Sequence, residues 1–416
     1  MSQVTGISGS AALRQYPGGE RIRALNDLDV ENKRVFVRVD YNVPMKDGKI
    51  VDDTRIRASL PTLQNLISRG AKLVCASHLG RPKDGPDPKY SLEPIAERLG
   101  ELLQMDVVFA HDCVGQAVAR QARDLRSGQI LVLENLRFHP GEEKNLHEFS
   151  HKLSALCDVY VNDAFGTCHR AHASTAGLPG LIPKAKGAGL LLEKEIGALS
   201  ELVHNPQRPL VSILGGSKVS DKVKVIEALM VKSSKILIGG AMAYTFLRVL
   251  KIQTGDSRVE TEMVSLAAKI LERSQAMNCK IVLPMDHVTG KTFDNPGTPQ
   301  VTENAHIPEG RIALDIGPRT RELFKRELVG AQTIFWNGPM GVFEKPGFEE
   351  GTYSLAREIA ALKIPSKICG GGDSVSAVHA AGVEAGFTHI STGGGASLEM
   401  VEGSPMPGIE ALKLNP

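Results

Sequence analysis

Basic side chains and a histidine recur in the first half of the chain at positions that suit the binding of a small anion. His78 and Arg81 stand in the segment SHLGRP, Arg137 stands in ENLRF, and Arg170 follows later. Guanidinium groups form forked hydrogen bonds with phosphate and carboxylate oxygens. A histidine alone is more often structural, but together with three arginines it predicts an anion pocket.

The second half of the chain offers glycines beside lysines instead. Gly215-Gly216-Ser217-Lys218 is expected to close a strand and to open a helix that carries Lys218 and Lys222 one turn apart. Like charges at this spacing repel each other, so a solvated helix face is the ordinary interpretation. Directly after a glycine turn, however, both ammonium groups would lie near a ligand, and we favour that reading.

Two further glycine runs, Gly370-Gly371-Gly372-Asp373-Ser374 and Thr392-Gly393-Gly394-Gly395, are expected between a strand and a helix. Backbone N–H groups at a helix start bind anions, and Asp373 could hold a Mg²⁺ that bridges phosphates. A capped helix after a tight turn would explain Asp373 or Ser374 but not three consecutive glycines. The chain has no Walker A loop and no Gly-x-Gly-x-x-Gly after a strand, which weakens the common nucleotide-binding classes.

These residues must be positioned by the elements around them, and the chain alternates β-branched apolar runs with amphipathic stretches, as parallel α/β units do. One such helix is expected over Ser91–Leu103, with Ser91 as its cap. The expected strands are Val35–Asp40, Lys72–His78, Val107–Ala110, Gln129–Glu134, Val159–Asp163, Leu210–Gly215, Lys235–Gly239, Lys280–Met285, Ile312–Ile316, Thr333–Asn337, Lys367–Gly370 and Thr388–Thr392. Open parallel sheets bind ligands beyond the carboxyl ends of their strands. Charged ends in one half and glycine ends in the other suggest a group passed between two anionic ligands.

Length and composition limit the number of domains and the classes of partner that the chain can have. The chain has 416 residues, which exceeds what one hydrophobic core usually supports, so we expect two domains. Lys and Arg number 49 against 47 Asp and Glu, a formal charge of +2 that gives no overall field for nucleic acid or an anionic membrane. Glycine, with 42 residues, is in excess, which indicates either flexible linkers or close approach of backbone to a ligand.

Several features point to a soluble cytoplasmic protein. The six cysteines form no Cys-x-x-Cys pair and are interpreted as buried thiols. The first 19 residues contain no apolar segment of a secretory signal and are expected to form a mobile arm, with a targeting or docking role as the weaker alternative. The most apolar stretch, Ile236–Leu247, is too short to span a bilayer.

Other candidate chemistry finds less support in the residue spacing. Cys168, His169 and His172 fit no common zinc spacing, and Asp52 and Asp53 beside Arg55 and Arg57 resemble a surface ion-pair cluster. No nucleophilic triad and no protein-kinase catalytic loop can be identified from spacing. An acceptor already ionised at neutral pH would need no general base, only alignment, positive charge and the exclusion of water.

An ordered set of segments resembles the phosphoglycerate kinase family from about Asn26 to the C-terminus. The segments are RVDYNVP (38–44), SHLGRP (77–82), ENLRFHPGEE (134–143), NDAFG (162–166), LGGSKVSDK (214–222), WNGPMGVFE (336–344), GGGDS (370–374) and STGGGASLE (391–399). Each motif alone is weak, whereas the ordered set is specific. The resemblance implies reversible transfer of the acyl phosphate of 1,3-bisphosphoglycerate to Mg-ADP, which gives 3-phosphoglycerate and ATP. The competing class is a non-catalytic nucleotide- or anion-binding protein on the same scaffold.

The resemblance also implies roles for residues that match the family motifs. The glycerate and its 3-phosphate would be held by Asp40, Asn42, Arg55, His78, Arg81, Arg137 and Arg170. The nucleotide would be held by Gly216, Lys218, Lys222, Gly239, Ala313, Asn337, Pro339, Val342, Glu344, Gly372, Asp373 and Ser374, with Asp373 on Mg²⁺. The transferring group would be met by Arg55, Lys218, Gly372 and Gly395.

The resemblance implies two Rossmann-like three-layer domains with mostly parallel sheets, facing across a hinged cleft, in a monomer. We expect an arm over 1–19, a phosphoglycerate-binding domain over 20–189, an interdomain helix over 190–204 and a nucleotide-binding domain over 205–403. The tail, 404–416, would pack back on the first domain. Each ligand would bind its own domain, so transfer would require hinge closure.

Two positions depart from the family pattern. Ala241 and Ala313 stand where the family usually has glycine, and each adds a methyl group at a site of close approach. We therefore predict that Ala313→Gly changes the affinity for ADP without abolishing activity. Calorimetric titration of both proteins with ADP tests this, and equal dissociation constants would contradict it.

Overall fold

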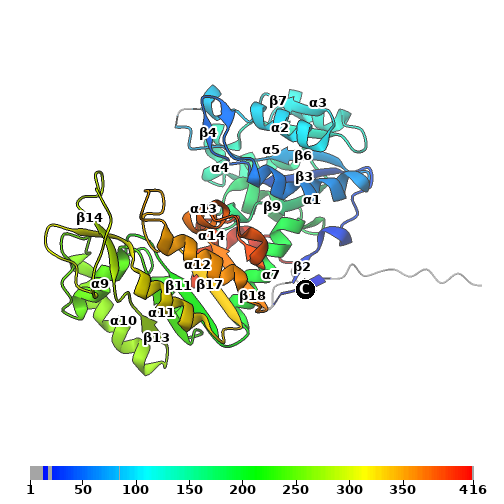
Figure 1. Ribbon diagram of the computed structural model, residues 1–416. Helices are drawn as coiled ribbons and strands as arrows, with labels where there is room; N and C mark the ends of the chain where they lie inside the picture. The colour runs from blue at the N-terminus through cyan, green and yellow to red at the C-terminus, as the bar shows by residue number, and fades with distance from the viewer. Residues whose placement is uncertain (1–12, 17–20, 84, 415–416) are drawn as a thin grey trace, which may run out of the picture. The chain divides into compact units, whose positions relative to one another are not determined.

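The alternation of strands and helices folds into two successive parallel α/β sheets (Figure 1). The computed structural model describes residues 13–16, 21–83 and 85–414. The chain divides into unit 1, Met1–Gly197 with Pro405–Pro416, and unit 2, Ala198–Ser404. Of the expected arm, residues 1–12 and 17–19 lie outside the described residues, while Leu13–Gln15 form a strand.

Unit 1 is built on a six-stranded, wholly parallel sheet with the order β10-β9-β3-β6-β8-β7. Its strands are β3 (Arg34–Val39), β6 (Lys72–Ala76), β7 (Val107–Ala110), β8 (Ile130–Leu133), β9 (Val159–Asp163) and β10 (Lys186–Ala188). Two small antiparallel pairs are β1 (Leu13–Gln15) with β2 (Arg21–Arg23) and β4 (Met45–Lys46) with β5 (Lys49–Ile50). The helices are α1 (Thr54–Ser68), α2 (Glu93–Leu103), α3 (Gln116–Asp124), α4 (Pro140–Glu143), α5 (His147–Ser154), α6 (Leu178–Leu181) and α15 (Pro407–Glu410).

Alternation along β3 divides the interior of unit 1 between the two sheet faces. Val35, Val37 and Val39 belong to the core that α1 and α2 cover, and Ile56 and Leu99 are part of that core. Phe36 stacks on Tyr160 of β9, with ring centroids 6.1 Å apart. Arg38 shares the parity of Phe36 along β3, so its charge is buried on that face.

Unit 2 repeats the design with the parallel order β13-β12-β11-β17-β18-β19. These strands are β11 (Leu210–Leu214), β12 (Lys235–Ile238), β13 (Lys280–Val282), β17 (Thr333–Asn337), β18 (Ser366–Gly370) and β19 (His389–Ile390). The helices are α8 (Val223–Met230), α9 (Met242–Val249), α10 (Val264–Ala276), α11 (Pro318–Leu328), α12 (Glu350–Ala361), α13 (Gly372–Ala380) and α14 (Gly395–Glu402). Helix α7 (Leu190–His204) contains the boundary between the two units.

One face of the unit 2 sheet is covered by α11 and α12, which lie side by side in front of β11 and β17 (Figure 1). Phe324 of α11 and Ile359 of α12 share a buried core with Ile213 and Trp336 of these strands. Chain topology thus places the carboxyl ends of β11, β17 and β18 next to one another at one edge.

The expected strand at Ile312–Ile316 forms as β16 but joins a different sheet. It pairs antiparallel with β14 (His287–Gly290), which pairs in turn with β15 (Gln300–Val301). The parallel sheet of unit 2 therefore has one strand fewer than the sequence suggested. Several expected strands also end earlier than predicted, because their last residues belong to the loops that follow the strands. Strand β6 ends at Ala76, before His78, and β13 ends at Val282.

Ser91 acts near the start of its helix, although it is not the cap residue. Helix α2 begins at Glu93 with Leu92 at the cap position, and the Glu93 N–H donates to Ser91 Oγ at 3.2 Å. Ser91 Oγ in turn donates to Glu134 Oε2 at 2.7 Å, which ties this helix start to the end of β8. In the described part of the chain, no helix is both long and apolar enough to cross a membrane.

Backbone meets backbone where β11 and β17 end. A Cβ at Gly215 would overlap the carbonyl oxygens of Pro339 and Gly338, and a Cβ at Gly338 would overlap Gly215. By contrast, a Cβ at Gly372 would meet nothing within 4 Å. These glycines therefore serve different purposes: the first two allow two main-chain segments to cross in contact.

We predict that Gly215→Ala lowers the unfolding free energy of unit 2 by roughly 1–3 kcal/mol or more, because the added methyl group overpacks a backbone crossing. Trp336, the single tryptophan, is buried in β17, so its fluorescence during urea denaturation reports on this unit. The matched variant Gly372→Ala should stay within about 0.5 kcal/mol of wild type. Equal unfolding free energies for Gly215→Ala and wild type would contradict the overlap.

Candidate active site

Four neighbouring strands of unit 1 bring the predicted anion-binding residues to one edge of the sheet. Asp40 and Asn42 follow β3, His78 and Arg81 follow β6, Arg137 follows β8 in a 3₁₀ turn (Leu136–Phe138), and Arg170 follows β9. The order β9-β3-β6-β8 makes these strand ends adjacent. The sheet topology therefore brings the predicted anion-binding residues together, and we call this region the basic edge of unit 1.

Arg55, at the second position of α1, belongs to this edge. Its Nη1 donates to the Asn42 carbonyl at 2.9 Å and lies 3.2 Å from Asp40 Oδ2. Asn42 Oδ1 accepts the Gly80 N–H at 2.9 Å, which joins the loop after β3 to the loop after β6. Asp40 and Asn42 thus hold Arg55 in place from two directions.

The interpretation of Asp52, Asp53, Arg55 and Arg57 as one surface cluster is wrong for Arg55. Asp53 pairs instead with Arg57 at 2.8 Å and with Arg98 at 2.8 Å. Arg55 and Arg57 are two positions apart on α1, so their side chains leave the helix in different directions.

A buried arginine that received no role from sequence lies behind this edge. Arg38 is fully buried, and its Nε donates to Ser174 Oγ at 2.8 Å while its Nη2 lies 3.3 Å from His78 Nδ1. The sequence does contain a signal for this residue. An arginine between Val37 and Val39 on a central strand is expected to be buried, and a buried charge needs a polar partner.

Burial, together with nearby positive charge, lowers the pKa of the two histidines near Arg38. Burial lowers the pKa of His78 well below its usual value, and the charges of Arg38 and Arg137 lower it further. Burial and the same two arginines lower the pKa of His172 to about 4. Both imidazoles are therefore neutral at pH 7 and supply hydrogen bonds, whereas the arginines supply charge. The pair His169 and His172, which the sequence left without a zinc pattern, belongs to this basic group, in which His169 Nε2 lies 3.0 Å from Arg170 Nε.

Glu142 is the buried counter-charge. It is fully buried and accepts hydrogen bonds from the Ser174 N–H at 2.9 Å and from Ser174 Oγ at 2.5 Å. Burial raises the pKa of Glu142, and the nearby Arg38 lowers it. The chain Arg38–Ser174–Glu142 offsets part of the repulsion among the basic groups.

Arg137 and Arg81 differ in exposure. Arg137 donates to the Gly80 carbonyl at 2.7 Å and lies 3.2 Å from Glu143 Oε1, and burial lowers its pKa. Arg81 and Arg170 are exposed. The edge therefore combines fixed, half-buried charges with exposed ones that a ligand can recruit.

In unit 2 the glycine-rich strand ends surround a pocket of about 330 Å³. Of the residues predicted for the nucleotide and the transferring group, the pocket is lined by Gly216, Lys218, Lys222, Asn337, Pro339, Gly372, Asp373, Ser374 and Gly395. Strands β11, β17 and β18 and the starts of α13 and α14 contribute this lining.

Lys218 and Lys222 do not stand on a helix face, so the expected helical spacing is wrong. Residues 215–222 form a loop, and α8 begins only at Val223, with Lys222 at the cap position. Lys222 Nζ donates to Asn337 Oδ1. Burial lowers the pKa of Lys222, and Asp221, Glu402 and Asp373 raise it in opposition.

A carboxylate that is distant in the sequence fixes this loop by hydrogen bonds. Glu260 is 9% exposed and accepts hydrogen bonds from the N–H groups of Val219 and Ser220 and from Ser220 Oγ. These N–H groups follow Lys218 directly. Burial acts to raise the pKa of Glu260, but the hydrogen bonds from Ser220 and Val219, together with the charge of Lys218, lower it. Sequence reasoning missed Glu260, since nothing local in the sequence links it to a loop about 40 residues away.

Helices α13 and α14 start at the pocket as the glycine runs predict. Gly371 precedes α13 with φ +90°, and Gly394 precedes α14 with φ +54°, conformations that favour glycine. Ser374 Oγ accepts the Gly338 N–H at 2.5 Å, and Asn337 Nδ2 donates to the Gly370 carbonyl at 2.7 Å. The first turn of α13 is therefore fixed against the end of β17, with its N–H groups free of Cβ crowding at Gly372.

Asp373 fits a magnesium–nucleotide complex. It is exposed in the first turn of α13 and lines the pocket, and its charge acts on Lys222. Mg²⁺ is usually held by one or two carboxylates together with substrate phosphates, so a single carboxylate beside a pocket lined by two helix starts suits it.

Four predicted nucleotide-binding residues do not line this pocket. Gly239 directly follows β12, and a Cβ there would overlap Met340 Sδ, while Ala313 is 6% exposed in β16. Val342 donates its N–H to the Leu314 carbonyl at 2.8 Å, and Glu344 is exposed. Val342 is thus attached to β16 next to Ala313, and all four residues lie outside the lining of this pocket.

Comparisons with known proteins lead to the same family that the sequence motifs resemble. The family model described as phosphoglycerate kinase matches residues 25–404. The phosphoglycerate kinase of Anaeromyxobacter sp. (strain Fw109-5) is 50% identical over 395 residues, covering 94% of this chain and 99% of that protein. The phosphoglycerate kinase of Thermus thermophilus is 51% identical over 393 residues, covering 94% of this chain and 100% of that protein.

Solved structures agree in fold. The phosphoglycerate kinase from Coxiella burnetii superimposes with a TM-score of 0.85 at 37% identity, covering 94% of this chain and 98% of that one. Identity of about one half over nearly the whole length, together with this fold, makes the chain a member of the phosphoglycerate kinase family.

Proposed function

We propose that the basic edge of unit 1 binds phosphoglycerate and that the pocket of unit 2 binds Mg-ADP or Mg-ATP, for the phosphoglycerate kinase reaction of the family. The observation that carries this assignment is chemical contrast: arginines and histidines gather in unit 1, while glycines, two lysines and helix starts gather in unit 2. The family supports the enzyme over a non-catalytic binding protein.

In unit 1, Arg55, Arg137 and Arg170 supply charge to the carboxylate and phosphate of the glycerate, and Arg81 adds an exposed guanidinium. Asp40 and Asn42 orient Arg55 and accept hydrogen bonds from the substrate hydroxyl. His78, neutral because of its lowered pKa, contributes a hydrogen bond without adding charge.

In unit 2, Lys222 and the start of α13 bind nucleotide phosphates, while Lys218 and the N–H groups near Gly372 and Gly395 meet the transferring group. Gly216, Asn337 and Pro339 shape the pocket, and the group of Gly239, Ala313, Val342 and Glu344 serves the adenosine. When bound with the nucleotide, Mg²⁺ neutralises phosphate charge, and Asp373 would hold it.

The chemical step needs no general base. An oxygen of the ADP β-phosphate attacks the acyl phosphorus, the bond between phosphorus and the carboxyl oxygen breaks, and 3-phosphoglycerate leaves as a carboxylate. Charge develops on the transferring oxygens, which Arg55 and Lys218 stabilise. Because these two residues belong to different units, transfer requires that both ligands be brought together, with α7 as the proposed hinge element.

We further propose that the protein acts as a monomer in the cytoplasm, without nucleic-acid or membrane partners. Its formal charge of +2 supports the absence of nucleic-acid and membrane partners, because such a charge creates little overall field.

Purified protein tests the function directly. It should form ATP from 1,3-bisphosphoglycerate and Mg-ADP, followed in a coupled assay. No turnover above background would favour the non-catalytic binding protein.

Arg55→Ala should lower kcat/KM by at least ~100-fold, because it removes charge that contacts the transferring group. Arg57→Ala is the matched control on the same helix and should stay within about twofold, since it loses only an exposed ion pair. Steady-state kinetics of both variants give the two kcat/KM values and test whether Arg55 acts on the reaction. Equal losses would show that α1 matters only for folding.

Lys218→Ala should lower kcat by ~100-fold or more and leave the dissociation constants of 3-phosphoglycerate and Mg-ADP nearly unchanged, as expected for charge used in the transition state. Lys224→Ala, on the exposed side of α8, is the control. Kinetics and calorimetry together separate the two effects, and a loss confined to KM would remove Lys218 from the chemical step.

A further inference from the structure

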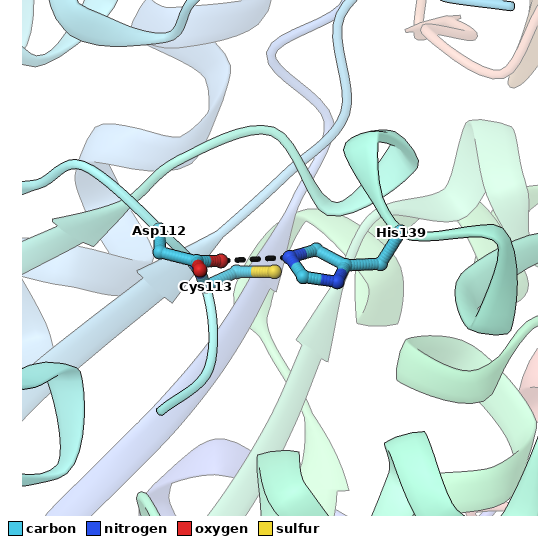
Figure 2. Close-up of side chains that lie close together, drawn as sticks. All are labelled: Asp112, Cys113 and His139. Carbon is cyan, nitrogen blue, oxygen red and sulfur yellow. Dashed lines mark hydrogen bonds and ion pairs between the residues drawn. The ribbon is translucent and has the colours of Figure 1, made fainter. Parts of the chain in front are cut away.

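Unit 1 also brings three side chains of metal-ligating type together beyond the ends of β7 and β8, beside the residues predicted to bind the substrate anion (Figure 2). Asp112 and Cys113 follow β7, and His139 stands between the 3₁₀ turn that carries Arg137 and helix α4. Neither the sequence motifs nor the proposed reaction gives these three side chains a role.

The ligand atoms of the three residues converge. Asp112 Oδ1 lies 2.7 Å from His139 Nε2, and the carboxylate oxygen, thiol sulfur and imidazole nitrogen all lie within 4.8 Å of one another. In a tetrahedral zinc site with bonds of about 2.0–2.3 Å, ligand atoms are roughly 3.3–3.6 Å apart. Shifts of about an ångström would therefore open the present arrangement around an ion.

Local contacts already orient two of the three ligands, Asp112 and His139. Asp112 Oδ1 accepts the backbone N–H of Cys113 at 2.6 Å, and the His139 ring stacks on Phe149 with centroids 5.3 Å apart. Cys113 is fully buried, and within the described part of the chain its sulfur makes no hydrogen bond. Since the side chains of Asp112 and His139 are 50% and 34% exposed, an ion can enter from solvent.

We propose that Asp112, Cys113 and His139 bind Zn²⁺, with water as the fourth ligand. A mixed sulfur, nitrogen and oxygen set suits zinc, whereas Mg²⁺ prefers oxygen ligands only. On binding, the thiol proton leaves to solvent, and the proton that His139 Nε2 shares with Asp112 is replaced by the metal as the ring takes the Nδ1–H tautomer. Because His139 is two residues from Arg137, the ion would also fix the segment that carries this substrate-binding residue.

Metal binding to the full chain tests the proposal independently of catalysis. Metal-free protein is titrated with Zn²⁺ against a chromophoric chelator, and with Cd²⁺ while the ultraviolet thiolate-to-metal charge-transfer band is followed. We expect one saturable site with that band. Cys113→Ser should abolish the band, and Cys113→Ser and His139→Asn should each weaken Zn²⁺ binding by at least ~10-fold.

Two variants separate ligation from folding. Asp112→Asn keeps an oxygen that can accept the Cys113 N–H, so it should fold normally yet bind Zn²⁺ more weakly. Cys157→Ser changes another buried cysteine of unit 1 and should leave binding unchanged. Thermal unfolding without metal verifies that each variant folds, and added Zn²⁺ should raise Tm for wild type and Cys157→Ser but not for Cys113→Ser.

Three outcomes would overturn the proposal: no saturable binding, a charge-transfer band that persists in Cys113→Ser, or unchanged affinity in Asp112→Asn and His139→Asn. A further contrary result is loss of binding on His147→Asn or His151→Asn alone. These histidines lie one turn apart on α5 with ring centroids 4.4 Å apart, and such a result would assign the ion to them.

Discussion

Mutual repulsion among the basic groups at the carboxyl edge of the unit 1 sheet is the constraint on which the arrangement of that edge depends. Arg38, Arg55 and Arg137 all act on the ionisation of His78, so these positive charges share one region. Three devices offset the repulsion: the buried carboxylate of Glu142 reached through Ser174, the pairing of Arg55 with Asp40, and the neutral state of the histidines. Removing a buried counter-charge would leave its partner uncompensated, which is costly in a protein interior.

The pocket of unit 2 is built from different chemical groups. It relies on backbone N–H groups and two lysines, and the glycines that provide it divide into two sets. Gly215, Gly240 and Gly338 allow main-chain segments to touch one another, whereas Gly216, Gly372 and Gly395 have open space where a Cβ would stand. Only the second set leaves bare backbone for a ligand. The glycine excess therefore reflects both backbone crossing and ligand approach.

Much of this could be predicted from sequence where the signal is local. The positions of most strands, the helix starts at Gly372 and Gly395, and most of the pocket lining follow from short motifs. Partners that are distant in the sequence could not be predicted. Glu260 accepts hydrogen bonds from the loop that follows Lys218, where a helix was expected, and Arg38 donates to Ser174, 136 residues away. The separate sheet of β16 was missed for the same reason, because its partner β14 carries a weak strand pattern.

The proposed reaction requires phosphoglycerate and nucleotide to bind to different units of one chain. Hydrogen–deuterium exchange with each ligand alone tests it most directly. We expect 3-phosphoglycerate to protect backbone amides around 38–42, 77–81 and 136–139, and Mg-ADP to protect those around 215–222, 337–340 and 371–375. Protection of the same segments by both ligands, or of unit 1 by Mg-ADP alone, would contradict it.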